Sequence, residues 1–191
     1  MIKLELSFFG GGSSGGDWAG DGGGGGNATN VTLAGEEVMQ DVATALSRGA
    51  SEFPEIADAV DVSDILEADF DGGVLGTFNR GTGEITLQRG LPSGGGQGTR
   101  EWVAAHEVGH GMSTNPPPGF RTAEQTMAAA TRQHNSGRTS GRLSQAGLAR
   151  QISRYAGTSP REAVAEAFAD WTINGNNSSR ASQIIMSNWR D

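Results

Sequence analysis

The chain has 191 residues, a length that fits one compact domain with a tail. Its net charge is −8 and it contains no basic stripe, which disfavours nucleic acid as a partner. It has no cysteine, so disulfide bonds and zinc sites of the cysteine type are excluded.

We expect a flexible glycine-rich segment over residues 1–30, followed by one folded domain over residues 31–191. The start of the chain is a poor signal peptide, and no apolar run reaches the ~20 residues that a membrane helix needs. The expected place of synthesis is the cytoplasm, with no membrane partner; residence in a phage particle and delivery without a signal peptide are the alternatives. Apolar residues alternate at the start of the tail, which indicates a tether to a partner, with a tail without a role as an equal alternative.

The first part of the folded domain is expected to hold a helix and a β-hairpin. Thr32 can cap a helix over residues 34–48, whose apolar side chains share one face. Residues 53–70 fit a short helix and a strand equally well. Two strands over residues 74–79 and 84–89, joined by a glycine-containing turn, predict the hairpin.

Helices dominate the remainder of the chain. Residues 90–99 are glycine-rich and predict a flexible connector. It leads into a helix from Arg100 to Met112, which Thr99 can cap and which the prolines after Asn115 end. Further helices are predicted over residues 123–134, 143–154 and 160–173, and a last one after a cap at Ser178.

The segment His106-Glu107-Val108-Gly109-His110 is an HExxH motif within the helix that starts at Arg100. Imidazoles four residues apart leave the same face of an α-helix and can bind one Zn²⁺ at about 2.0–2.1 Å. Glu107 lies where it can reach a metal-bound water without binding the metal, which is the general-base position. Gly109, a poor helix former, is expected to permit close packing near the metal. An HExxH that arose by chance is the competing interpretation; against it, two of the three histidines of the chain fall in the motif.

A catalytic zinc site takes three protein ligands and keeps one position open for water, so the chain has to supply a third ligand. In one known pattern a third histidine follows HExxH closely, but Pro116 occupies that position here. His134 is the remaining histidine and lies in a polar stretch, so we expect it to be a solvated surface residue. A carboxylate from a second helix is therefore the expected third ligand.

The helix over residues 160–173 is the natural source of that carboxylate. Glu162, Glu166 and Asp170 share one face of it, and the alanines around them keep the helix slim. Ser159 and Glu162 also match a capping box, in which Glu162 caps the helix and Glu166 binds the metal instead. The spacing does not choose between these two alternatives.

The sequence from Tyr155 through the helix to Phe168 resembles the active-site region of gluzincin metallopeptidases, in particular the catalytic domain of anthrax lethal factor and related peptidase domains of bacterial toxins and phage head proteins. In that family HExxH is followed some tens of residues later by a tyrosine, a short turn and a Glu-x-x-x-Glu helix. The resemblance implies that Glu162 is the third zinc ligand, that Glu166 orients a ligand histidine and that Tyr155 stabilises the oxyanion. It covers roughly residues 74–171 and carries no substrate specificity.

Motif and resemblance together predict an α+β, zincin-like metallopeptidase domain, in which the HExxH helix packs against the glutamate-bearing helix beside a small sheet. The expected activity is a zinc-dependent endopeptidase, with one zinc ion and a protein or peptide as substrate. A zinc-stabilised structural module of a phage or secretion particle and a self-processing domain are the alternatives. The second hairpin strand is expected to be a sheet edge that binds the substrate; its residues are Glu84, Ile85, Thr86, Leu87 and Gln88.

Overall fold

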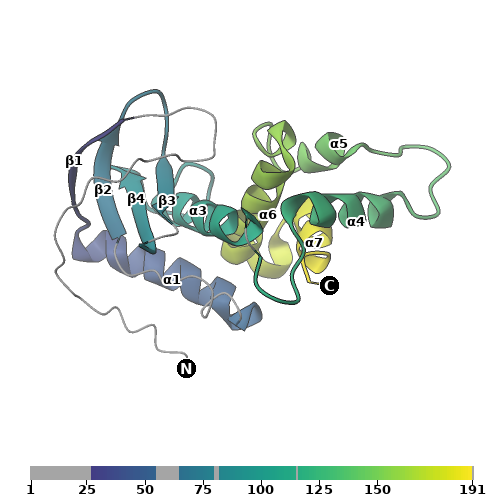
Figure 1. Cartoon of the computed structure of the whole chain (residues 1–191), viewed down its shortest axis with the longest axis horizontal. Helices are drawn as coiled ribbons and strands as arrows, with labels where there is room; N and C mark the ends of the chain where they lie inside the picture. The colour runs from purple at the N-terminus through teal and green to yellow at the C-terminus, as the bar shows by residue number, and fades with distance from the viewer. Residues whose placement is uncertain (1–26, 55–64, 80–81, 115, 191) are drawn as a thin grey trace.

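The computed structural model describes residues 27–54, 65–79, 82–114 and 116–190. The predictions for residues 1–26, and those for residues 55–64 and for the start of the hairpin turn, lie outside the described residues. The described part is α+β, with a four-stranded mixed sheet at one end and most of the helices at the other (Figure 1). Within it, no helix combines the length and the apolar character that crossing a membrane requires.

Strands and helices follow one another in a mixed order along the chain. The strands are β1 (Ala28–Leu33), β2 (Ile65–Phe70), β3 (Gly76–Asn79) and β4 (Glu84–Gln88). The described α-helices are α1 (Glu36–Glu52), α3 (Arg100–Thr114), α4 (Ala123–Asn135), α5 (Gln145–Ala149), α6 (Pro160–Asn174) and α7 (Arg180–Ser187). Two short 3₁₀ turns, η1 (Ala156–Thr158) and η2 (Gly175–Asn177), flank α6.

The sheet has the strand order β1-β2-β4-β3. The predicted hairpin of β3 and β4 is confirmed, since these strands pair antiparallel from Gly76 opposite Leu87 to Asn79 opposite Glu84. The prediction that Glu84, Ile85, Thr86, Leu87 and Gln88 form a sheet edge is wrong. This strand pairs on its other side with β2, in parallel, so both of its rows of backbone groups are used inside the sheet. Among the described strands, β3 and β1 are the edges.

The start of the domain also differs from the prediction. Thr32 does not cap a helix but belongs to β1, where it pairs with Glu67 of β2. The first helix begins two residues later than predicted, at Glu36, and its N-cap Gly35 offers no side-chain hydrogen bond. Because β1 starts at Ala28, the ordered domain includes residues that the glycine-rich composition assigned to the tail.

The helices of the second half agree well with the predictions, with two exceptions. Both hydrogen bonds of the capping box at Thr122 and Gln125 are present at the start of α4. The predicted helix over residues 143–154 is reduced to the short α5. At its start, the Asn135 side chain bonds both the N–H and the C=O of Leu143 and holds it outside the helix. After Ala149 the chain continues in turns, in which the Gln151 N–H bonds the Leu148 C=O. The last helix, α7, has Ser179 as its cap instead of Ser178.

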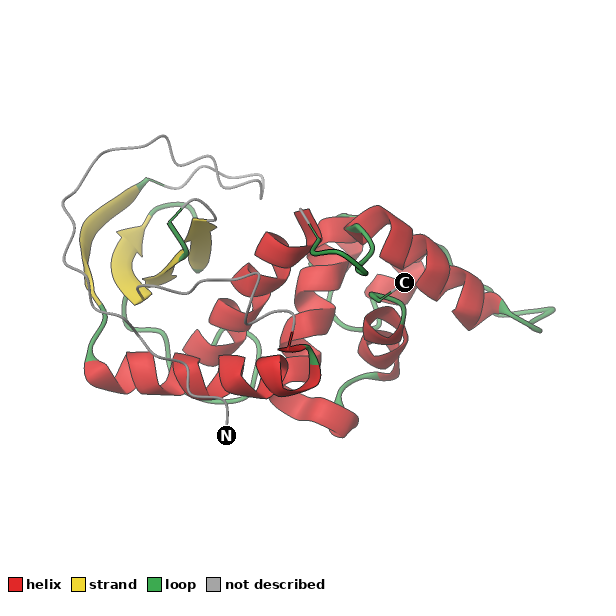
Figure 2. Cartoon of the chain, turned by 60° about the horizontal axis from the view of Figure 1, so that its bottom comes forward, coloured by secondary structure: helices red, strands yellow, loops and turns green. Residues whose placement is uncertain are grey.

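Close packing of α3 against α6 builds the centre of the molecule. A Cβ atom at Gly109 of α3 would lie 2.8 Å from the Cα atom of Ala165 in α6, so the two helix backbones touch at this point. This confirms the close packing that the glycine predicted. Helix α1 runs from beneath the sheet to the near side of the helical half (Figures 1 and 2), where it contacts α3 and α6. The rings of Phe53, Phe120 and Trp189 pack edge to face and join the end of α1 to the C-terminal end of the chain.

Candidate metal centre

Helix α3 supplies two imidazoles on one face. His106 is buried and His110 half-buried, and their ring centroids lie 4.6 Å apart. The two rings are close because the histidines are four residues apart on one continuous helix, as the motif predicted. Both Nε2 atoms face the first turn of α6.

Glu162 lies in that first turn. Its backbone N–H donates to the hydroxyl of Ser159, which caps α6, at 3.1 Å. Its side chain is directed at α3, where Oε2 lies 3.2 Å from Nε2 of His106 and 3.2 Å from Nε2 of His110. Of the two alternatives that the spacing left open, the structure thus brings the Glu162 carboxylate, and not that of Glu166, to the two Nε2 atoms.

The three side chains fit a divalent metal ion. Each of His106, His110 and Glu162 offers one ligand atom, and these atoms lie within 4.8 Å of one another. Ligand atoms bonded at 2.0–2.1 Å to a tetrahedral zinc ion are about 3.3–3.4 Å apart, close to the 3.2 Å contacts observed. Oε2 of Glu162 is buried and has no hydrogen-bond partner among the described residues. A buried carboxylate oxygen without a partner is costly, and a bound cation removes that cost.

The charges of the metal-free cluster are strongly coupled. Burial alone would lower the pKa of His106, but the carboxylates of Glu162 and Glu166 beside its two nitrogens raise it to about 10. Burial raises the pKa of Glu162, but the neighbouring imidazoles of His106 and His110 outweigh this and lower it to about 2. At neutral pH the metal-free cluster therefore contains an imidazolium next to a carboxylate.

Glu166 lies behind His106, one turn further along α6. Its Oε1 is 3.1 Å from Nδ1 of His106, at ion-pair distance but without the alignment of a good hydrogen bond. Its other oxygen, Oε2, accepts a hydrogen bond of 3.1 Å from Nε2 of Gln97. Gln97 belongs to the stretch between β4 and α3 and was missed by the sequence analysis. A single long polar side chain between Gly96 and Gly98 is the signal that was available.

Glu107 of α3 lies next to strand β3. A Cβ atom on Gly76 of β3 would lie 3.3 Å from Cγ of Glu107, so the glutamate side chain runs directly beside this strand. Burial raises the pKa of Glu107, although the neighbouring His106 and His110 act in the opposite direction. A carboxylate whose pKa is raised is a stronger base than an exposed one.

Tyr155, the only tyrosine of the chain, lies between α5 and α6. Its ring centroid is 5.9 Å from that of His106, and its side chain is otherwise exposed. Partial burial and the carboxylate of Glu162 raise the pKa of Tyr155 to about 12. Its hydroxyl therefore keeps its proton at neutral pH and is available as a hydrogen-bond donor above the cluster.

Two residues of the earlier expectations lie outside the metal cluster. His134 is at the end of α4 and is half-buried, away from the HExxH face of α3. Asp170 continues the acidic stripe of α6 and is buried like the two glutamates. Its carboxylate, however, accepts hydrogen bonds from the Ser182 hydroxyl at 2.6 Å and the Ser179 N–H at 2.9 Å. Asp170 thus holds the start of α7.

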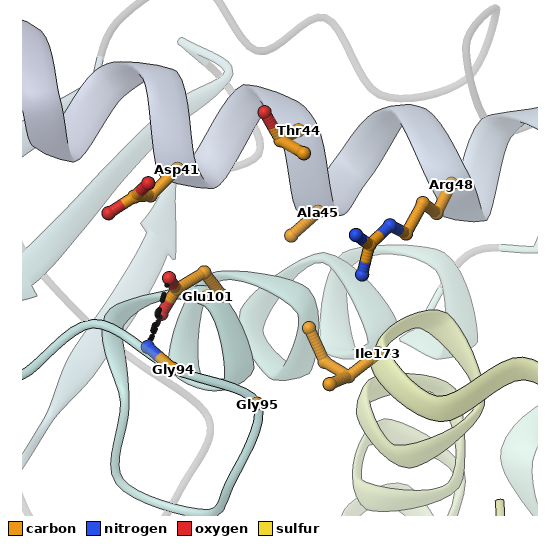
Figure 3. Close-up of a pocket in the computed structure, with 8 residues that line it drawn as sticks. All are labelled: Asp41, Thr44, Ala45, Arg48, Gly94, Gly95, Glu101 and Ile173. Atoms are coloured by element: carbon orange, nitrogen blue, oxygen red, sulfur yellow. Dashed lines mark hydrogen bonds between the residues drawn. The ribbon is translucent and has the colours of Figure 1, made fainter. Parts of the chain in front are cut away.

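A cavity lies between α1, the glycine-rich stretch and the end of α6, and Figure 3 shows the side chains that line it. None of the residues of the metal cluster is among them. The cavity and the cluster are therefore separate features, on different sides of α3. Comparison of the chain with protein-family models, with curated proteins and with solved structures found no match.

Proposed function

We propose that the protein is a zinc-dependent endopeptidase with a zincin-like fold, in which His106, His110 and Glu162 hold the metal ion. One observation carries the proposal. A buried carboxylate oxygen of Glu162 lies 3.2 Å from Nε2 of both HExxH histidines and has no hydrogen-bond partner among the described residues. The donor set of two imidazoles and one carboxylate suits zinc.

The number of ligands favours catalysis over a structural role. Structural zinc sites are closed by four protein ligands, whereas catalytic sites have three and an open position. The cluster has three members within the part of the chain that the structure describes. Glu107 adds a carboxylate with a raised pKa directly next to it, which a purely structural site does not need.

The chemistry follows from the side chains around the cluster. A bound zinc ion supplies a Lewis acid, which polarises a carbonyl group and lowers the pKa of a coordinated water toward about 7. Glu107 accepts a proton from the attacking water at its carboxylate and returns it to the amide nitrogen that leaves. Tyr155 donates a hydrogen bond from its hydroxyl to the carbonyl oxygen as negative charge develops there. Glu166, next to Nδ1 of His106, fixes the tautomer and the orientation of the ring.

The substrate strand is assigned to β3 instead of β4. In an antiparallel pair, residues alternate between those that bond the partner strand and those that face away from it. The bond from the Gln88 N–H to the Leu75 C=O sets this alternation, so the N–H and C=O groups of Gly76 and Phe78 face the edge with which no described strand pairs. An extended peptide that pairs with this edge lies next to Glu107.

Zinc content and proteolysis of three variants test the proposal. The protein is reconstituted with zinc and dialysed, its metal content is measured, and cleavage of an unfolded protein substrate is followed. Glu107→Gln should keep one zinc ion and lose cleavage, whereas Glu162→Ala should lose zinc affinity. Glu124→Gln, a change at an exposed glutamate of α4, is the matched control and should behave as the wild type.

A wild-type protein that binds no zinc would overturn the proposal. If the wild type binds zinc but does not cleave the substrate, the site is structural. If Glu107→Gln cleaves the substrate as fast as the wild type, the general-base role of Glu107 is wrong. The mass of the purified chain with and without a chelator separates cleavage of its own segments from cleavage of other proteins.

A further inference from the structure

The glycine-rich stretch between β4 and α3 is held in one conformation. The carboxylate of Glu101 accepts a hydrogen bond from the Gly94 N–H at 3.0 Å (Figure 3). It also accepts one from the Ser93 hydroxyl at 2.8 Å. The Thr99 hydroxyl lies 2.8 Å from the carbonyl oxygens of both Gly94 and Gly96. The expected flexible connector is therefore a loop in which the side chains of Glu101 and Thr99 bond the backbone of Gly94 and Gly96, just before Gln97.

Packing against α6 fixes the same loop from the other side. A Cβ atom on Gly95 would lie 3.2 Å from Cγ2 of Ile173, so the loop backbone rests on the last turns of α6. Gly94 and Gly98 have backbone φ angles of 146° and 81°, which L-residues with a side chain rarely adopt. The glycines thus let the loop backbone run close to α6. In this conformation of the loop, the side chain of Gln97 reaches Glu166.

The contact of Gln97 reaches the metal cluster through one intermediate. Nε2 of Gln97 donates to Oε2 of Glu166 at 3.1 Å, and Oε1 of Glu166 lies 3.1 Å from Nδ1 of His106. Glu166 is buried, so water does not compete freely for its carboxylate. A carboxylate held at one oxygen alone can rotate about its last bond, whereas one held at both oxygens cannot.

We propose that Gln97 is a positioning residue of the metal site, which fixes the Glu166 carboxylate and through it the ring of His106. The inference rests on the proposed zinc site. A glutamine suits this place because its amide group donates a hydrogen bond without adding charge. A lysine or an arginine here would neutralise Glu166 and weaken its hold on the imidazole.

Two variants of the full chain separate the Gln97 amide from the order of the loop. Gln97→Met keeps the length of the side chain and removes the donor. Ser93→Ala removes a hydrogen bond that holds the loop but has no contact with Glu166, and is the matched control. Zinc affinity is measured by competition with a chelator, and the visible absorption spectrum of the cobalt-substituted protein reports the geometry of the ligands.

Gln97→Met should weaken zinc binding about three- to tenfold, below the 10- to 100-fold typical of a residue that contacts a ligand histidine directly, and should change the cobalt spectrum. Ser93→Ala should leave both within about twofold of the wild type on the same scale. If the wild type binds one zinc ion and Gln97→Met matches it in affinity and spectrum, the role of Gln97 is wrong while the proposed function stands. Equal losses in both variants would likewise overturn it, because the order of the loop then explains the effect. A wild type that binds neither metal overturns the proposed function itself.

Discussion

The carboxylate of Glu166 lies 3.1 Å from Nδ1 of His106, on the side of the ring that faces away from the metal cluster. A histidine that binds a metal through Nε2 carries its proton on Nδ1, so the carboxylate is placed to accept that proton in a hydrogen bond. In the proposed metal site the glutamate would make the imidazole a stronger donor to the metal and restrict its rotation.

Replacement of Glu166 by glutamine tests this relationship. The substitution removes the negative charge next to Nδ1 of His106, and we expect zinc affinity to fall about 10- to 100-fold. Asp170→Asn is the matched control, because Asp170 is buried on the same face of α6 but bonds Ser182 and the start of α7. It should reduce stability by about 1–3 kcal/mol and leave zinc affinity nearly unchanged. Chelator competition measures the zinc affinity of both variants, and thermal unfolding measures their stability. If Glu166→Gln binds zinc as tightly as Asp170→Asn, the role of Glu166 is wrong.

Binding of zinc should release a proton near neutral pH. The pKa of His106 in the metal-free protein is raised to about 10, so its imidazole is protonated at pH 7 and has to lose that proton to bind a metal. Zinc affinity should therefore rise with pH between about 6 and 9. Calorimetric titration in buffers of different ionisation enthalpy measures the number of protons released. A heat of binding that does not depend on the buffer would contradict the assigned state of His106.

The stability of the metal-free domain should depend on pH in the opposite way. A raised pKa stabilises the folded state below the unfolded value of 6.5 for His106, and this contribution is lost as the pH rises toward about 10. The lowered pKa of Glu162 stabilises it above 4.5, and this contribution is lost as the pH falls toward about 2. Both contributions to the free energy of unfolding are fully present between pH 4.5 and pH 6.5. Urea unfolding with a chelator present should therefore show higher stability at pH 5.5 than at pH 9.

The close packing at Gly109 predicts that alanine at this helix position destabilises the domain, the reverse of its usual effect in a helix. Alanine is favoured over glycine by up to about 1 kcal/mol in a helix interior. At Gly109, however, its Cβ atom would lie 2.8 Å from the Cα atom of Ala165, and the backbone of α6 would have to move. We expect Gly109→Ala to destabilise the domain by about 1–3 kcal/mol and to weaken zinc binding, because Glu162 moves with α6. Ser47→Ala, on the exposed side of α1, is the control and should be neutral or slightly stabilising. A more stable Gly109→Ala variant would contradict the close approach of α3 and α6.

Pairing of a substrate with β3 predicts a period of two in the substrate backbone. Only alternate residues of an added strand bond the free groups of Gly76 and Phe78. Methylation of one such peptide nitrogen removes a hydrogen bond worth about 1 kcal/mol, and should lower kcat/KM roughly fivefold or more. Methylation of the next nitrogen, which faces away, should have little effect. A series of substrate peptides, each methylated at one nitrogen, measures this pattern, and a smooth dependence on position would exclude β3 as the binding edge.

The helices that carry the candidate site could be predicted because their signals are local. HExxH, the cap at Ser159 and the stripe of Glu162 and Glu166 lie within single turns of a helix, and the structure contains both helices where the sequence placed them. The contact between them was foreseeable from Gly109, since a glycine inside a helix usually marks a close neighbour. The spacing did not choose between Glu162 and Glu166; the family resemblance indicated Glu162, and the structure brings its carboxylate to the two Nε2 atoms.

The order of the strands could not be predicted in the same way. Leu87 belongs to an inner strand only because Glu67 pairs with it from β2, and no pattern within the hairpin reports that distant partner. The glycine-rich loop was misjudged for a similar reason. Its composition indicates flexibility, but the side chains of Glu101 and Thr99 bond its backbone and remove that freedom.

The position of β1 has a practical consequence. Two strands, β2 and β4, separate it from β3, so the chain enters the domain at the sheet edge opposite the one beside Glu107. With strands spaced about 4.8 Å apart, the two edges are roughly 14 Å from each other. A carrier protein or an affinity label joined ahead of Ala28 is therefore attached at the edge remote from the one proposed to bind the substrate. Immobilisation through this end is expected to leave the β3 edge accessible.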